Sequence, residues 1–142
     1  MTANTLEVGQ VLATRHYPIS RDSLVRYAGA SGDFNPIHYR DDVAESVGLP
    51  GVLAHGMLTM GIAIQPLIEW CGNDYELLSY GVRFTKPVVV DATEGATVDV
   101  HVAVGAISQS DDGHTEIRCD LTVVAGGGEK VLGKAQAVIR PA

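Results

Sequence analysis

The segment Val52–Trp70 constrains the fold most, because its apolar residues are spread over nearly every face of a helix. A helix without a polar face is buried on all sides. The segment contains His55 and Pro66 and is followed by Gly72-Asn73, so we expect a buried core helix and no membrane span. Proline removes a backbone donor and predicts a kink or a local break, and the glycine predicts the end of the helix.

Four strand-like segments follow this helix. Apolar and polar side chains alternate along them, which is typical of strands with one buried face. Gly81 and Pro87 interrupt the first segment, and turns at 111–113 and 126–128 join the last three as hairpins. Antiparallel strands after one buried helix predict an α+β fold in which a curved sheet wraps around that helix. The expected strands span residues 77–90, 96–107, 115–124 and 130–139.

The residues before the apolar helix predict a strand and two helices. Residues 6–16 have the pattern of a strand, and Tyr17-Pro18 is expected to end it because proline cannot donate to a sheet ladder. Ser20 is the expected N-cap of a first helix that ends near Gly29–Gly32. Asp41–Val47 predicts a second, short helix.

The composition excludes some classes of protein. The chain has 142 residues, of which 46% are hydrophobic and 19% are charged, as expected for one globular domain over residues 1–142. A formal net charge of −7 argues against a general affinity for nucleic acid or anionic membranes.

Export and disulfide formation are not expected from this sequence. The segment Met1–Gly9 has neither a basic region nor an apolar core, so it does not resemble a signal peptide. Cys71 and Cys119 are too few and too far apart to indicate a disulfide framework or a zinc site. We therefore expect a reduced, cytoplasmic protein.

The segment Gly32–His38 places a carboxylate and an imidazole close together in a stretch that cannot be regular helix. Pro36 restricts Asn35 to extended or turn geometry, and Gly32 permits a sharp bend before Asp33. A stiff, bent segment of this kind aims Asp33 and His38 at one point. The alternative interpretation is an Asx-type turn in which the polar side chains bond only to their own backbone.

This segment, followed by Ala54-His55-Gly56-Met57-Leu58, resembles the hydratase motif of the MaoC-like enzymes. The resemblance covers essentially the whole chain. Within the family, the chain looks most like the 3-hydroxyacyl-ACP dehydratase B subunits of actinobacterial mycolic-acid synthesis. It implies a hotdog fold and the (R)-specific hydration of enoyl thioesters, or the reverse dehydration of 3-hydroxyacyl thioesters, in fatty-acid metabolism. No cofactor and no metal are implied.

The same resemblance assigns the catalytic roles to Asp33 and His38, which would hold one water between them. The identity of the formal base is left open. Gly56 is expected at the start of the buried helix, where backbone amides lack partners and suit a developing oxyanion. The alternative for Gly56 is tight packing of helix against sheet.

Other candidates surround this pair. Asn35 either bonds the thioester region or holds the turn, and His55 either lies near the carbonyl or is a hydrogen-bonded structural residue. Tyr27 and Thr59 are supporting candidates only. A metal site built from Asp33, His38 and His55 is not expected, because their spacing matches none of the recurring zinc patterns.

The expected substrate carrier is CoA or an acyl carrier protein. Arg83 and Lys86 form a small basic feature in an acidic chain, which suits the phosphates of either carrier, although a solvated strand edge is an equal alternative. A sheet with one helix leaves an open edge, and the family implies a homodimer or a heterodimer with a paralogous hotdog subunit. The rival functions are an acyl-thioesterase and a thioester-binding subunit without activity.

Overall fold

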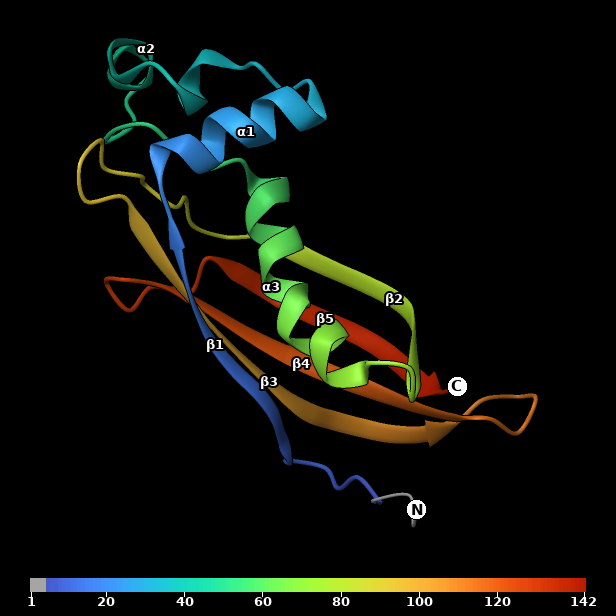
Figure 1. Ribbon diagram of the computed structural model, residues 1–142. Coiled ribbons are helices and arrows are strands. Elements are labelled where there is room, and N and C mark those ends of the chain that lie inside the picture. Colours follow the sequence, from blue (N-terminus) through green and yellow to red (C-terminus); the bar gives the residue numbers. More distant parts are fainter. Residues whose placement is uncertain (1–4) are drawn as a thin grey trace.

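The computed structural model describes residues 5–142, so part of the Met1–Gly9 segment lies outside the described residues. Five strands form one antiparallel sheet in the order β1-β3-β4-β5-β2, and three α-helices and one 3-10 turn accompany it (Figure 1). The elements are β1 (Val11–Ile19), α1 (Arg21–Ser31), η1 (Pro36–His38), α2 (Asp41–Ser46), α3 (Gly56–Cys71), β2 (Tyr75–Phe84), β3 (Ala96–Gln109), β4 (Thr115–Ala125) and β5 (Leu132–Pro141).

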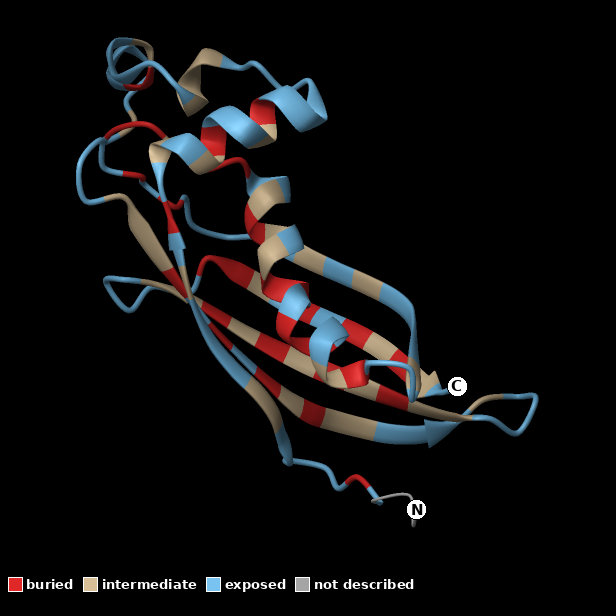
Figure 2. Cartoon of the chain, viewed as in Figure 1, coloured by how far each residue is buried: buried red, intermediate tan, exposed pale blue. Residues whose placement is uncertain are grey.

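The sheet curves around α3, and the core lies between them (Figures 1 and 2). Alternate residues of the central strands are fully buried, as in the series Val98, Val100, Val102 of β3. Leu67 and Ala63 of α3 are equally buried on the facing side. This arrangement confirms the predicted α+β fold with a curved sheet around one helix, and apolar burial of this kind is its main stabilising term.

The first strand is displaced from its predicted position. β1 spans Val11–Ile19 and passes through Tyr17 and Pro18, whereas the sequence predicted a strand over 6–16 that ends at this dipeptide. The prediction was wrong because β1 is an edge strand that pairs only with β3. A proline is tolerated on an edge strand, because only one side of such a strand takes part in the ladder.

The helical predictions for the N-terminal part are confirmed. Ser20 caps α1, and its side chain accepts a hydrogen bond from the Ser23 amide. Gly32 ends the helix with φ of 76°, a left-handed conformation that glycine adopts without strain. α2 covers Asp41–Ser46. Both helices lie at the end of the sheet where α3 begins (Figure 1).

The apolar helix begins later than predicted. α3 starts at Gly56, and the residues before it run beside the strand-like segment 88–90 instead. The Ala54 amide donates to the Val88 carbonyl at 2.8 Å, and the Val90 amide donates to the Val52 carbonyl at 2.9 Å. The helix continues through Pro66 without a break.

One face of α3 is exposed, so the prediction that this helix is buried on all sides was wrong for the single chain. The exposed residues follow a helical spacing along one stripe, on which Met57 is 58% exposed and Ile68 is 43% exposed. Gly61 and Gln65 lie between them on the same stripe. No helix within residues 5–142 is long and apolar enough to cross a membrane.

The four predicted strands after α3 are present, but the first ends at Phe84 and not at the predicted residue 90, while the other three are shifted only slightly at their ends. β2 runs through Gly81, where the register shifts, and it ends at Phe84 before Pro87. The prediction that Gly81 breaks the strand was therefore wrong, because the ladder continues past Gly81 with a bulge that places one extra residue on β5. The predicted hairpin turns are confirmed, with Gly113 and Gly128 at φ of 84° and 86°.

Candidate active site

The motif segment between α1 and α2 is held by its own polar side chains. The Asp33 amide donates to Ser31 Oγ at 3.1 Å, and the Asn35 amide donates to Asp33 Oδ1 at 3.2 Å. Asn35 Oδ1 accepts from the Ile37 amide at 3.2 Å and begins the 3-10 turn. The Asx-type turns of the alternative interpretation are therefore present, and they leave Asp33 Oδ2 free to face elsewhere.

The second oxygen of Asp33 faces His38. Asp33 Oδ2 lies 4.0 Å from His38 Nε2. The other ring nitrogen, Nδ1, lies 2.7 Å from the Leu53 carbonyl oxygen. A carbonyl oxygen only accepts, so Nδ1 carries the proton, and in the neutral ring Nε2 presents a lone pair toward Asp33. The His38 side chain is 10% exposed and that of Asp33 is 51% exposed.

His55 packs against both members of this pair. Its ring stacks on His38 with centroids 3.9 Å apart, and the Tyr27 ring meets it edge-on at 4.7 Å. His55 Nε2 lies 3.1 Å from the Asp33 carbonyl oxygen, to which it donates. The residue is 1% exposed, and burial lowers the pKa of His55 below its ordinary value. The ring is therefore held neutral.

The three side chains also come close enough to be considered as a metal site. Ligand atoms of Asp33, His38 and His55 all lie within 4.8 Å of one another. An imidazole binds a metal through a lone pair in the plane of its ring. The two rings are stacked with an angle of 23° between their planes and their centroids 3.9 Å apart, so their lone pairs lie in two separate, nearly parallel planes and do not converge on one ion. The geometry fits a hydrogen-bonded cluster better than a metal site.

A cavity of about 270 Å³ opens beside His38. Gly56 and Thr59 of α3 lie on its wall together with His38, and Phe84 and Lys86 lie on the side of β2. The remaining wall is mostly apolar and comes from distant parts of the chain. Its apolar residues are Leu53, Ala54, Pro87, Val88, Val131 and Leu132.

The amide of Gly56 is placed as predicted, at the first residue of α3. The main-chain hydrogen bonds of the helix begin with the amides of Leu58 and Thr59, which donate to the His55 carbonyl. The Gly56 amide comes before them and has no acceptor among residues 5–142. A Cβ atom at position 56 would lie 3.0 Å from the Phe84 ring. The lack of a side chain thus keeps open the space between the helix end and β2.

The structure places the remaining candidate residues in different surroundings. The side-chain oxygen of Asn35 is used by the turn. Thr59 is 3% exposed and reaches the cavity wall. Lys86 lines the cavity, whereas Arg83 lines a different hollow on the sheet. Arg83 and Lys86 therefore do not form one basic feature.

Comparison with known proteins identifies the family. The model of the MaoC-like domain matches residues 3–123. This chain belongs to the MaoC-like family. The predicted family is confirmed, and the narrower resemblance to mycolic-acid dehydratase subunits stays a prediction.

Several curated relatives of the MaoC-like chain are named as hydratases or dehydratases. It is 44% identical over 73 residues to 3-hydroxyacyl-thioester dehydratase X of Mycobacterium tuberculosis, a match covering 51% of this chain and 25% of that protein. It is 32% identical over 83 residues to the (R)-specific enoyl-CoA hydratase of Rhodospirillum rubrum, covering 58% of each. The matches thus span about a quarter of the first protein and over half of the second.

Solved structures share the fold over the whole length. An (R)-hydratase from A. caviae involved in PHA biosynthesis superposes with a TM-score of 0.81 at 26% identity, covering 96% of this chain and 98% of that one. The ChsH1–ChsH2 complex from Mycobacterium tuberculosis contains a chain of the same fold, with a TM-score of 0.78 at 21% identity over the full length of both. These neighbours confirm the predicted hotdog fold.

Sequence reasoning missed the wall of the cavity in the MaoC-like chain. Val88 follows β2 and Val131 precedes β5, and no local pattern connects either with the motif around Asp33. The pairing of 52–54 with 88–90 brings the first into place. For Val131 the sequence did contain a signal, because this residue lies at the start of the predicted strand that follows the hairpin turn between β4 and β5.

Proposed function

We propose that this chain catalyses the reversible hydration of trans-2-enoyl thioesters to (3R)-hydroxyacyl thioesters. The observation that carries the proposal is the 4.0 Å separation of Asp33 Oδ2 and His38 Nε2 beside a cavity whose wall includes the Gly56 helix end. A water oxygen about 2.8 Å from each atom bridges such a gap. The (R)-hydratases and dehydratases among the relatives support this assignment.

In this mechanism, the water oxygen bonds to the β carbon while one of its protons passes to the Asp33–His38 pair. The electrons of the double bond move toward the thioester carbonyl, so the thioester becomes an enolate with negative charge on its oxygen. The pair then returns the proton to the α carbon, so one water is added in total. Dehydration runs through the same steps in reverse.

His38 is the group we propose to take the proton from water. Its Nδ1–H is fixed on the Leu53 carbonyl, and this bond leaves the lone pair of Nε2 turned toward Asp33 and the cavity. Asp33, with Oδ1 bound by the Asn35 amide, orients the water through Oδ2. The pair is thus held in position before substrate binds, which lowers the entropic part of the barrier.

The enolate oxygen is proposed to bind at the Gly56 amide. An N–H group at a helix start, supported by the helix dipole, faces negative charge favourably. Donors of this kind contribute about 2.7–4 kcal/mol to transition-state stabilisation. The apolar wall that includes Val88 and Leu132 would then hold the acyl chain, and burial of that chain supplies binding free energy.

A crotonyl-CoA assay distinguishes hydration from thioester hydrolysis. We expect the absorbance of the enoyl thioester to fall without release of free thiol, because the proposed water attacks the β carbon. Thiol appearing at the rate at which the enoyl signal disappears would identify an acyl-thioesterase. A lack of change in both signals, with crotonyl-CoA still bound, would identify a thioester-binding subunit.

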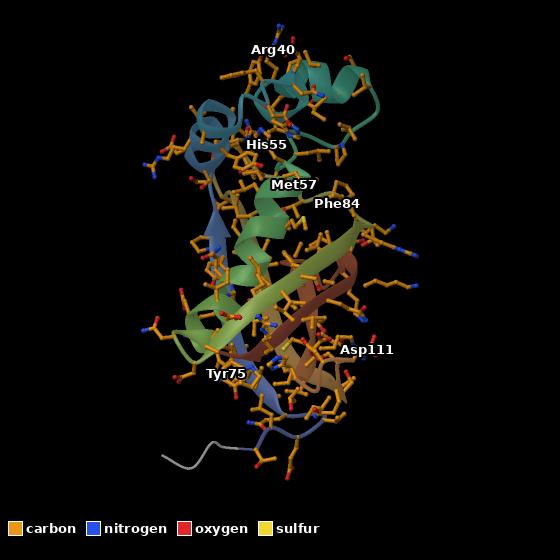
Figure 3. The ribbon with its side chains drawn as sticks, turned by 90° about the vertical axis from the view of Figure 1, so that its right-hand side faces the viewer. Arg40, His55, Met57, Tyr75, Phe84 and Asp111 are labelled. Carbon is orange, nitrogen blue, oxygen red and sulfur yellow. The ribbon has the colours of Figure 1, made fainter. Side chains whose placement is uncertain are left out.

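We further propose that the chain works as a dimer, either with itself or with a paralogous hotdog subunit. β2 is an edge strand, and it exposes Leu77 and Leu78 at 42% and 41%. Met57 of the exposed α3 stripe and Phe84 at the end of β2 are also exposed, and they lie on the same side of the molecule (Figure 3). A second β2 strand paired along this edge satisfies its main-chain groups and covers the stripe.

The expected mass in solution follows from this pairing. Light scattering of the purified chain at working concentration should give twice its mass of 15.0 kDa, or the mass of a heterodimer when the paralogous subunit is co-expressed. Lys substitutions at Leu77 and Leu78 should shift the mass to that of one chain, because they place charge in the interface. A single-chain mass for the unmodified protein under both conditions would contradict the proposal.

A further inference from the structure

A second hollow of about 340 Å³ lies on the face of the sheet that points away from α3. Strand alternation fixes this side, because Ala135 and Ala137 of β5 are buried against the core and the residues between and before them point outward. The polar lining of this outer-face hollow consists of Ser79 and Arg83 from β2, Arg118 from β4, and Lys134 and Gln136 from β5.

The charged side chains that line the outer-face hollow are opposite in sign to the net charge of the protein. The chain has ten lysines and arginines and a net charge of −7, yet all three charged residues on this lining are cations. Arg118 is oriented by Asp120, with Nε 3.0 Å from Oδ1 and Nη2 3.3 Å from Oδ2. Gly105 of β3 makes this possible, since a Cβ atom there would collide with the Asp120 carboxylate.

Lys134 occupies the outer-face hollow at a cost in backbone conformation. Its φ of 42° makes it the one non-glycine residue with positive φ within residues 5–142. The register between β2 and β5 shifts next to it, between Gly81 and Arg83. Bulges of this kind redirect a side chain, and a strained conformation persists where the surroundings fix it, often at binding sites.

We propose that the outer-face hollow binds a phosphate group of the thioester carrier. Guanidinium and ammonium groups recognise phosphate through charge-assisted hydrogen bonds, and Ser79 and Gln136 add neutral donors. The assignment to the carrier rests on the proposed hydratase function. It is supported by position, because Arg83 of the hollow directly precedes Phe84 of the substrate cavity.

The two sites adjoin at the end of β2. β2 stops at Phe84, so a flexible pantetheine arm leaving the cavity past Lys86 can pass around the strand end to the outer face. A partner strand paired along β2 would use main-chain groups in the plane of the sheet and leave this face open. The hollow is thus accessible in the proposed dimer.

Adenosine 3′,5′-bisphosphate, which carries the phosphates of CoA without the thioester, tests the site independently of activity. We expect it to raise the Tm of the unmodified protein and to raise that of Lys134→Gly and Arg83→Ala much less. Lys134→Gly should itself have a higher Tm without ligand, because glycine relieves the positive φ. Lys130→Ala, which removes an exposed cation outside the hollow, should respond like the unmodified protein.

Turnover of two substrates tests the link to the carrier. Losing one charge-assisted contact should raise KM for crotonyl-CoA about tenfold in Arg83→Ala and Lys134→Gly, with kcat unchanged. KM for crotonyl-pantetheine, which has no phosphate, should stay constant. Equal bisphosphate-induced Tm shifts in all variants would overturn the site, and equal KM changes for both substrates would overturn its assignment to the carrier. If no variant turns over any thioester, the failure is that of the proposed function, and the Tm shifts still decide whether a phosphate site exists.

Discussion

Asp33→Asn and His38→Ala are each expected to lower kcat for crotonyl-CoA hydration by at least about a hundredfold, the usual effect of losing a positioned acid–base group. The asparagine keeps the shape of Asp33 and loses the charge that orients water. The alanine removes Nε2, the atom that faces Asp33 Oδ2 at 4.0 Å. Initial rates at saturating substrate measure the change.

The two substitutions differ in their expected effect on stability. Asp33 is half exposed, so its replacement by the isosteric amide should leave the free energy of unfolding within about 0.5 kcal/mol. His38→Ala loses the bond to the Leu53 carbonyl and the stack on His55, which costs about 1–3 kcal/mol. Denaturant unfolding of both variants separates this structural loss from the loss of activity.

A matched control exists on the same chain. His16 and Asp99 form a second imidazole–carboxylate pair, which is exposed, with 2.5 Å between Nδ1 and Oδ1, across β1 and β3. Asp99→Asn and His16→Ala should leave kcat unchanged, because this pair does not line the cavity. More than about a tenth of normal activity in Asp33→Asn or His38→Ala would contradict the mechanism.

Much of the fold could be predicted because its signals are local. Ser20 and Gly32 mark the ends of α1 through cap chemistry that needs no tertiary contact. Glycine turns at 111–113 and 126–128 define the hairpins in the same way. The proximity of Asp33 and His38 follows similarly from a bend and a proline within one short segment.

The errors arose where distant segments decide the outcome. Pro18 lies inside a strand because β1 is at the edge of the sheet, and strand order is not a local property. The exposed stripe of α3 carries Met57 and Ile68 without cover in one chain, which is the pattern expected if a second chain covers them. Arg83 and Lys86 are separated because β2 ends at Phe84, so Lys86 lies beyond the strand and lines the cavity, whereas Arg83 lines the outer-face hollow.

The role of His55 became visible only from tertiary contacts. The sequence placed it inside the apolar segment Val52–Trp70 and left open whether it lies near the carbonyl or is a hydrogen-bonded structural residue. The structure stacks it on His38 and bonds it to the Asp33 carbonyl, while its ring is 1% exposed and is not part of the cavity wall. We therefore propose that His55 positions the catalytic pair and does not contact substrate.

Two substitutions test the ring stack of His55 and its hydrogen bond to Asp33 separately. His55→Phe keeps a ring against His38 and loses the donor to Asp33, whereas His55→Gln keeps an N–H donor and loses the ring. Each should lower kcat between about tenfold and a hundredfold, because small displacements of reacting groups have effects of this size. KM should change little, since His55 does not line the cavity. Unchanged kcat in both variants would show that the stack is not needed for positioning.

The stability of the protein against pH supplies a readout that is specific to the buried imidazole. Burial lowers the pKa of His55 below 6.5, so the unfolded chain binds a proton at this residue before the folded protein does. The associated loss of stability is absent above about pH 7 and grows as the pH falls through 6.5 toward the lowered value. Tm should therefore drop less between pH 7.5 and pH 5 in His55→Phe than in the unmodified protein. The exposed His114→Phe should retain the full drop, and an identical pH dependence in His55→Phe would mean that the imidazole of His55 is not held neutral by burial.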